Sequence, residues 1–368
     1  MRKVLYLMAA AMLTACGGGN GYSIKGTVEG SQDGDSVFLQ KRENRQMVRI
    51  AATTIKNGSF SFDGVQDSAV VRYIVYSDID DNNNGIDFFL ENGNISIDLN
   101  AVSPSATGTP NNNAYQAVRD RLATLQADEA KVYDSLSDDS LSEAQRDSLE
   151  KQIEALDDEL SNTLIDGCRN NIGNEAGIYM LKQSYYYMDD DQLEEITNLI
   201  PERFLSDPSV ANIKAYVEKK KATAVGQKYA DIQLKDPDGN DVKLSDYVGK
   251  SKLLLVDFWA SWCGPCRQEM PTLVKAYEQY KGKGFQIVGI SLDRNAEDWK
   301  QGISELGITW PQMSDLKYWD SAAADLYAVN SIPHTVLIDQ DGTIVARGLR
   351  GDALLEKLTG LDNSKKSK

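Results

Sequence analysis

Two cysteines spaced for redox chemistry are the residues of this chain with the clearest chemical potential. They lie in Trp262-Cys263-Gly264-Pro265-Cys266, after the apolar run Leu253–Trp259 and before residues compatible with a helix. A cysteine between a strand and a helix lies at a helix N-terminus, where the dipole and free N–H groups favour the thiolate and lower its pKa below about 8.5. We predict that Cys263 is an exposed nucleophile, and that Cys266, one turn further and more buried, resolves the mixed disulfide.

Asp257 lies in the apolar run, six residues before Cys263. Desolvation should raise the pKa of this carboxyl group, which would then exchange a proton with Cys266. The alternative is a carboxylate at the strand edge that pairs with a lysine. A zinc site at the two cysteines would need a second pair of ligands, and the sequence offers only Cys168 and His334, so we predict no metal.

This segment resembles the thioredoxin superfamily in several motifs. Val256–Ala260 before the two cysteines looks like thioredoxin, and Cys266–Pro271 is similar to the membrane-tethered extracytoplasmic branch, the TlpA/ResA-like reductases. Ser331–Thr335 stands where the family has its cis-proline loop, and Gln340–Thr343 predicts a hairpin turn. The resemblance covers residues 226–361 and implies an α/β thioredoxin-like fold.

The resemblance also implies roles for individual residues, and no cofactor. Pro333 is expected to be cis and to direct the backbone of Ile332 toward an incoming disulfide. The other residues expected to contact substrate are Trp262, Gly264 and Pro265. His334 is expected to be a solvent-facing loop residue, with tuning of the thiolate or contact with substrate as the alternatives.

The first fifteen residues predict a lipoprotein signal peptide. Arg2-Lys3 is a basic start, Val4–Met12 is apolar but too short to span a bilayer, and Leu13–Cys16 looks like a bacterial lipobox. Cys16 would be lipidated, and residues 16–21 would form a flexible tether. The alternative is an ordinary secretory peptide with an incidental cysteine. We expect a cell-envelope protein that faces the periplasm, attached to the outer or inner membrane only by lipid.

Charge and cysteine number narrow the possible partners. The formal net charge of −16 argues against nucleic acid and anionic membrane surfaces as partners. Of four cysteines, Cys168 alone has no assigned role. It is expected to be a buried small apolar residue, with a free reactive thiol or an intermolecular bridge as the alternatives.

The sequence at the front of the chain predicts a β-rich domain. Residues 22–100 read as a small β-sandwich, with Asn57-Gly58 and Asn92-Gly93 as hairpin turns. This pattern resembles a domain of unknown function found at the front of lipid-anchored thioredoxin-like proteins. Asp80–Glu91 has the spacing of a calcium-binding EF-hand loop, but its β-type surroundings favour an acidic hairpin loop.

The middle of the chain predicts helices. Residues 101–113 read as a linker and 114–222 as a helical region with two antiparallel helices, the second capped by Ser140 and Glu143. Asp207-Pro208 predicts the start of a further helix. Residues 362–368 form a basic tail.

The sequence thus predicts a multi-domain, lipid-anchored thiol-disulfide oxidoreductase. Reduction is favoured, because Gly264-Pro265 resembles the reducing thioredoxins. The resemblance implies disulfide-containing exported proteins or apocytochrome c as substrates, and a membrane thiol transporter as electron donor. The alternatives are an oxidase or isomerase of the same fold, a thiol peroxidase, and a non-enzymatic lipoprotein scaffold.

Overall fold

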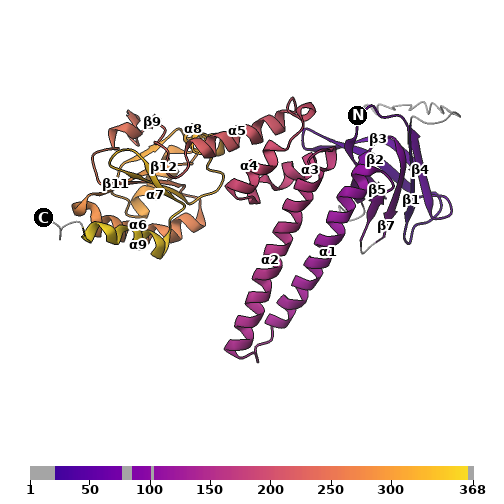
Figure 1. Ribbon diagram of the computed structural model, residues 1–368, viewed down its shortest axis with the longest axis horizontal. Coiled ribbons are helices and arrows are strands. Elements are labelled where there is room, and N and C mark those ends of the chain that lie inside the picture. The colour runs from indigo at the N-terminus through magenta and orange to yellow at the C-terminus, as the bar shows by residue number, and fades with distance from the viewer. Residues whose placement is uncertain (1–20, 77–84, 101–102, 364–368) are drawn as a thin grey trace, which may run out of the picture. The chain divides into compact units, whose positions relative to one another are not determined.

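The computed structural model describes residues 21–76, 85–100 and 103–363 (Figure 1). The predicted signal peptide, Cys16, most of the tether, residues 80–84 of the Asp80–Glu91 loop and residues 364–368 lie outside the described residues. The chain divides into two compact units. One contains Met1–Ser184 and Leu199–Pro201, and the other contains Tyr185–Asn198 and Glu202–Lys368.

The first unit begins with a β-sandwich, as predicted. Its two four-stranded sheets have the orders β4-β1-β7-β8 and β3-β2-β5-β6. The strands are β1 (Tyr22–Val28), β2 (Ser36–Glu43), β3 (Gln46–Thr54), β4 (Ser59–Gly64), β5 (Val70–Tyr76), β6 (Gly85–Leu90), β7 (Gly93–Leu99) and β8 (Ser105–Thr107). Alternate apolar residues, such as Phe60 and Phe62 in β4, are buried in a core shared by both sheets.

The prediction of two Asn-Gly hairpins is confirmed only for the Asn57-Gly58 turn itself, across which the backbones of Lys56 and Ser59 pair. It is wrong for the strands on either side of that turn and for Asn92-Gly93. β3 pairs with β2, whereas β4, which follows Asn57-Gly58, pairs with β1. In the same way β6 pairs with β5, and β7, which begins at Gly93, pairs with β1 and β8. Each turn therefore carries the chain from one sheet to the other. Positive φ at Gly58 and Gly93 permits the reversal, but burial of each strand's apolar face decides which strand it pairs with.

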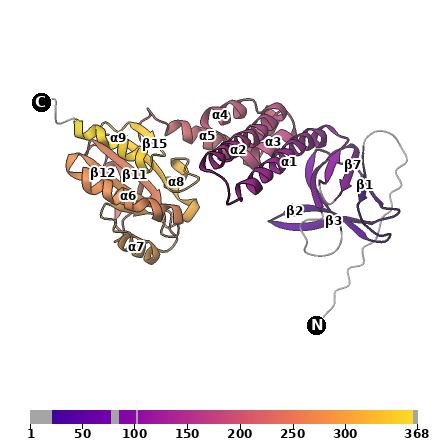
Figure 2. The same ribbon diagram turned by 90° about the horizontal axis from the view of Figure 1, so that it is seen from below.

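Three helices complete the first unit: α1 (Pro110–Leu136), α2 (Glu143–Asn171) and α3 (Glu175–Ser184). The predicted linker is largely structured, because β8 pairs with β7 and α1 begins at Pro110. α1 and α2 form the expected helical pair and run side by side in Figures 1 and 2. The predicted capping box at Ser140 is wrong by two residues: the Ser142 N–H donates to Gln145 Oε1 at 3.0 Å.

The second unit begins with helices η1 (Tyr185–Tyr187), α4 (Asp190–Asn198), η2 (Glu202–Phe204) and α5 (Pro208–Ala222). The predicted start of α5 is confirmed, since the Asp207 side chain accepts from the N–H groups of Ser209 and Val210. The predicted helical region 114–222 is therefore shared between the two units. In the part of the chain that the structure describes, no helix has both the length and the apolar character needed to cross a bilayer.

A seven-stranded sheet, ordered β10-β9-β13-β12-β11-β14-β15, forms the centre of the second unit. Its elements are β9 (Gln233–Lys235), β10 (Asp241–Lys243), η3 (Leu244–Asp246), β11 (Leu253–Trp259), α6 (Gly264–Tyr280), η4 (Lys281–Lys283), β12 (Phe285–Ser291), α7 (Ala296–Glu305), β13 (Gln312–Ser314), η5 (Tyr318–Asp320), α8 (Ala322–Leu326), β14 (His334–Asp339), β15 (Ile344–Arg347) and α9 (Gly351–Asn363). The hairpin predicted at Gln340–Thr343 is confirmed by the antiparallel pairing of β14 and β15.

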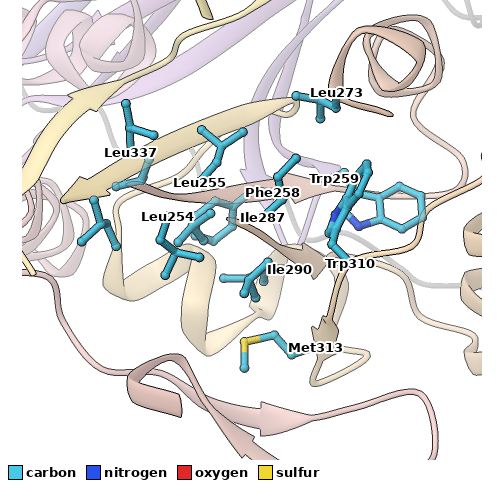
Figure 3. Packing of buried hydrophobic residues seen from close by; sticks show 14 of the residues in the cluster. Leu254, Leu255, Phe258, Trp259, Leu273, Ile287, Ile290, Trp310, Met313 and Leu337 are labelled. Carbon is cyan, nitrogen blue, oxygen red and sulfur yellow. The ribbon is translucent and has the colours of Figure 1, made fainter. Parts of the chain in front are cut away.

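β11 is the central strand that positions the two cysteines. It pairs in parallel with β12 and antiparallel with β14, so both of its edges are occupied. Figure 3 shows Leu254, Leu255, Phe258 and Trp259 of this strand among the apolar side chains of the core. Because the strand is buried on both faces and paired on both edges, its end is a rigid support for the residues that follow.

Candidate active site

Cys263 forms the junction between β11 and α6. It is the N-cap residue of α6, and its Sγ accepts from the Cys266 N–H at 3.1 Å. Cys263 and Cys266 form a disulfide. In the reduced protein the same N–H group and the helix dipole would face the Cys263 sulfur and stabilise its thiolate.

The prediction of an exposed Cys263 needs correction. Its exposed fraction is 4%, against 1% for Cys266. The order of burial is as predicted, but solvent reaches mainly the neighbours Trp262, Gly264 and Pro265. The sulfur is covered by its bond to Cys266 and by the Ile332 carbonyl oxygen, which lies 3.7 Å from Cys263 Sγ.

The loop opposite the disulfide contains the predicted cis peptide bond, between Ile332 and Pro333. Pro333 is buried, and its carbonyl oxygen accepts a hydrogen bond from the Arg350 guanidinium group. The loop therefore approaches Cys263 through the Ile332 backbone and is anchored on its other side by a charged donor. Sequence analysis did not identify Arg350, because it lies seventeen residues further along the chain.

Asp257 is buried, with an exposed fraction of 1%, and neither carboxylate oxygen has a hydrogen-bond partner among the described residues. Burial raises the pKa of this group to about 7, as predicted in direction. The Glu269 carboxylate contributes to this rise, whereas the Arg350 guanidinium opposes it. A buried acid with this pKa can both accept and release a proton near neutral pH.

Glu269 also links two helices at the site. Its Oε1 accepts from the Gly351 N–H, at the first residue of α9, at 2.8 Å. A carboxylate at a helix N-terminus is stabilised by the helix dipole. Because Glu269 lies three residues after Cys266, the two side chains lie on the same face of α6. The carboxylate that acts on Asp257 therefore comes from the face of α6 that also carries Cys266.

Asp293 is a second residue that sequence analysis missed. It is 1% exposed and accepts from the Ser261 N–H, at 3.1 Å, and from the Ser261 hydroxyl, at 2.6 Å. The Ser291 hydroxyl donates to it as well, at 2.7 Å. These bonds fix the turn immediately before Trp262. The available sequence signal was a carboxylate two residues after the end of the apolar strand β12.

His334 belongs to a separate network. It opens β14, where it is half-buried, and its Nε2 lies 3.3 Å from Arg347 Nη2. Burial and the Arg347 guanidinium lower the pKa of His334 to about 4, so the ring is neutral at pH 7. It pairs with Phe258, whereas Thr335 pairs with Asp257. His334 and Asp257 thus project from opposite faces of the sheet, and His334 is not a solvent-facing loop residue.

The remaining cysteine of the described chain is Cys168 in α2. It is fully buried and unbonded to another cysteine, as expected, and its Sγ lies 3.3 Å from the Ser184 hydroxyl oxygen. Burial raises the pKa of its thiol, which opposes thiolate formation. Within the ranges that the structure describes, no cluster of His, Cys, Asp and Glu could hold a metal ion.

A disulfide at the N-terminus of a helix, opposite a cis-proline loop on a central sheet, defines a thiol-disulfide oxidoreductase of thioredoxin-like fold. Two family models match the chain: the AhpC/TSA family over residues 225–347, and a domain of unknown function (DUF4369) over residues 22–115.

Curated relatives are named as thiol-disulfide oxidoreductases. The thiol-disulfide oxidoreductase ResA of Oceanobacillus iheyensis is 36% identical over 158 residues, which are 42% of this chain and 78% of that protein. ResA of Geobacillus kaustophilus is 33% identical over 129 residues, which are 35% of this chain and 71% of that protein. The chain belongs to this family of ResA-like thiol-disulfide oxidoreductases and carries the DUF4369 domain in front.

Among solved structures, the thioredoxin domain of a thiol-disulfide oxidoreductase from Bacteroides vulgatus is 41% identical. The match covers 37% of this chain and 96% of that one, with a TM-score of 0.35.

Proposed function

We propose that this enzyme reduces disulfides of exported proteins with the Cys263/Cys266 dithiol. The observation that carries the proposal is the Cys263 sulfur, placed between the N-terminus of α6 and the Ile332 carbonyl group. Gly264-Pro265 between the cysteines favours a reducing couple near about −270 mV over an oxidising one near about −120 mV.

The reaction would proceed in two exchanges. The Cys263 thiolate attacks one sulfur of the substrate disulfide, that bond breaks, and the other substrate sulfur leaves as a thiolate. Cys266 then loses its proton and attacks Cys263 Sγ, which breaks the mixed disulfide and releases the second substrate sulfur. The substrate gains two electrons, and the enzyme takes the oxidised form seen in this structure.

Asp257 would accept the proton of Cys266 in the second exchange. Burial and the Glu269 carboxylate, which lies on the Cys266 face of α6, raise the pKa of Asp257 to about 7. This value matches proton transfer at neutral pH. Glu269 and Arg350 would act on this step through Asp257. The lysine pairing considered as an alternative has no support, because neither Asp257 oxygen has a partner among the described residues.

Trapping of the mixed disulfide tests the proposal. In Cys266→Ser the resolving thiol is missing, so the reduced variant should accumulate covalent adducts with disulfide-bonded proteins such as insulin. The control Cys168→Ser should form none, because its two redox cysteines remain. Absence of adducts with Cys266→Ser, or adducts that do not involve Cys263, would contradict the proposal.

The redox potential separates reduction from the closest alternative. Equilibration of the Cys263/Cys266 couple with glutathione buffers should give a value near about −270 mV. A value near about −120 mV would instead support an oxidase or isomerase. Peroxidase activity has less support, because buried apolar Val256 and Ala260 occupy the positions of the proline and threonine that activate peroxide in peroxiredoxins.

Lipid attachment at Cys16 and a periplasmic location belong to the same proposal. The motif before Cys16 supports them, and a membrane thiol transporter would then return electrons to the dithiol, with apocytochrome c among the candidate substrates. Metabolic labelling with an alkyne fatty acid should label the wild-type protein and leave Cys16→Ser unlabelled. Equal labelling of both proteins would refute the anchor while leaving the redox proposal intact. A scaffold role for the first unit is compatible with both the lipid anchor and the reduction of disulfides.

A further inference from the structure

Three aromatic residues form an exposed cluster beside the disulfide; we call Trp262, Tyr318 and Trp319 the aromatic cluster. The ring of Trp262 lies 4.9 Å from that of Tyr318 and 6.4 Å from that of Trp319, centroid to centroid. Trp262 is 46% exposed and Trp319 is 37% exposed. Exposed tryptophans in contact are unusual on a soluble surface and are common where a partner binds.

The loop that carries Tyr318 and Trp319 is held in place by its own hydrogen bonds. Asp315 accepts from the N–H of Ala322 at 2.8 Å, and the Ser314 hydroxyl accepts from the N–H of Leu316 at 3.0 Å. Leu316 and Tyr318 have φ values of 56° and 59°, a conformation that bulky residues rarely adopt. The two rings are therefore presented in a fixed geometry, and a ligand need not order them on binding.

A cation covers part of the aromatic cluster. The Arg294 guanidinium carbon lies 4.2 Å from the centre of the Tyr318 ring. This contact supports Tyr318 from one side. The indole surfaces of Trp262 and Trp319 are left as the apolar area that a bound molecule could cover.

The aromatic cluster adjoins the nucleophilic cysteine. Trp262 precedes Cys263 directly, so a polypeptide joined to Cys263 through a mixed disulfide must place its neighbouring residues close to Trp262. A small disulfide such as oxidised glutathione carries no apolar side chain for this surface. A polypeptide half-cystine next to an aromatic or large aliphatic residue does carry one.

We propose that Tyr318 and Trp319, with Trp262, determine substrate specificity by binding an apolar side chain adjacent to the reacting cysteine of a polypeptide. The inference rests on the proposed disulfide reduction and adds the sequence context that the enzyme prefers. Aromatic contacts of this type strengthen binding in the transition state that leads to the mixed disulfide, so they raise the rate of the first exchange.

Matched disulfide peptides test the inference with the reduced full-length protein. Two cyclic peptides would differ at one position next to a half-cystine, which holds Trp in one and Gly in the other. The wild-type enzyme should react about tenfold faster with the Trp peptide. In Trp319→Ala and Tyr318→Ala the ratio of the two rate constants should fall to within about twofold of one, while Trp319→Phe should retain most of the preference.

The ratio of rate constants distinguishes specificity from structural damage, since misfolding lowers both rates together. Tyr133→Ala removes an exposed tyrosine from α1 and should leave the ratio unchanged. A wild-type ratio near one, or a full preference in both alanine variants, would overturn the inference. If the wild-type enzyme reacted with neither peptide, the proposed function would fail as well, so the two failures can be told apart.

Discussion

At the scale of single residues, Asp257 shows how burial creates a proton acceptor. Its two oxygens have no partner among the described residues, and its pKa of about 7 results first from desolvation, then from the Glu269 carboxylate, with Arg350 acting in the opposite direction. An unpaired buried carboxylate weakens a fold. Its presence on the central strand is therefore better explained by a role in the reaction than by a role in stability.

Asp257→Asn is expected to stabilise the oxidised protein while it slows the second thiol exchange. The pKa is about 7 in the folded protein and about 3.9 in the unfolded chain, so the cost of the buried charge grows from about pH 4 to pH 7 and is complete above pH 7. We predict an increase of about 2–4 kcal/mol in the free energy of unfolding at pH 8, and little change at pH 4. Urea unfolding at the two pH values measures this difference.

The exposed carboxylate of Glu356 on α9 provides the control. Glu356→Gln should change the free energy of unfolding by less than about 0.5 kcal/mol at either pH. A loss of stability in Asp257→Asn at pH 8 would show that the carboxylate has a partner after all. Resolution of the mixed disulfide at the wild-type rate would remove its catalytic role.

At the scale of elements, Arg347 joins α5 to the sheet that carries the active site. From the last residue of β15, its Nη1 donates to the carbonyl and hydroxyl oxygens of Thr223, each at 2.7 Å, and its Nη2 donates to the Tyr327 carbonyl oxygen at 2.6 Å. The fourth contact is with His334, the residue after Pro333. The C-terminal end of α5 is thereby connected to the strand that begins at the cis-proline loop.

Arg347→Met should lower the stability of the second unit and change the titration of His334. Loss of the guanidinium leaves buried carbonyl oxygens without donors, which should cost about 2–4 kcal/mol in the free energy of unfolding. The pKa of His334 should rise from about 4, since one of the positive charges that lower it is removed, and should stay below the free value because the ring remains buried. The chain has one histidine, so its NMR signal reports this pKa without ambiguity.

Arg267→Met is the matched comparison, because Arg267 forms an ion pair with Glu305 in which both side chains are at least 40% exposed. Its loss should cost less than about 1 kcal/mol. Equal destabilisation by the two substitutions would argue against a buried connection at Arg347. An unchanged pKa of His334 would contradict the electrostatic part of the interpretation.

At the scale of the whole molecule, local sequence patterns predicted the types of element more successfully than their connections. The apolar run Leu253–Trp259 and the cysteine pair are local signals, and they predicted the strand and the helix start, whereas the cis bond at Pro333 was expected from the family resemblance alone. Asn57-Gly58 was equally clear as a turn, but the pairing of the following strand depends on β1, far away in the sequence.

The residues that sequence analysis missed share this dependence on distant partners. Arg350 acts on Pro333 and Asp257, and Asp293 acts on Ser261, across separations that no helical or strand periodicity spans. The assignment of α4 and α5 to the second unit has the same origin, since contacts such as Arg347 with Thr223 bridge 124 positions. Fold class and the direction of the Asp257 pKa shift could therefore be predicted from the sequence, whereas the charged groups that act on Asp257 and Pro333 from distant positions could not.

The buried position of Cys168 has a practical consequence for an enzyme that works by thiol-disulfide exchange. A sulfur with no solvent-accessible surface cannot meet glutathione, a thiol-blocking reagent or a second molecule without opening of the first unit. Among the cysteines that the structure describes, a redox titration of the folded protein will thus report only the two-electron Cys263/Cys266 couple, and oxidants cannot rearrange that disulfide through the Cys168 thiol.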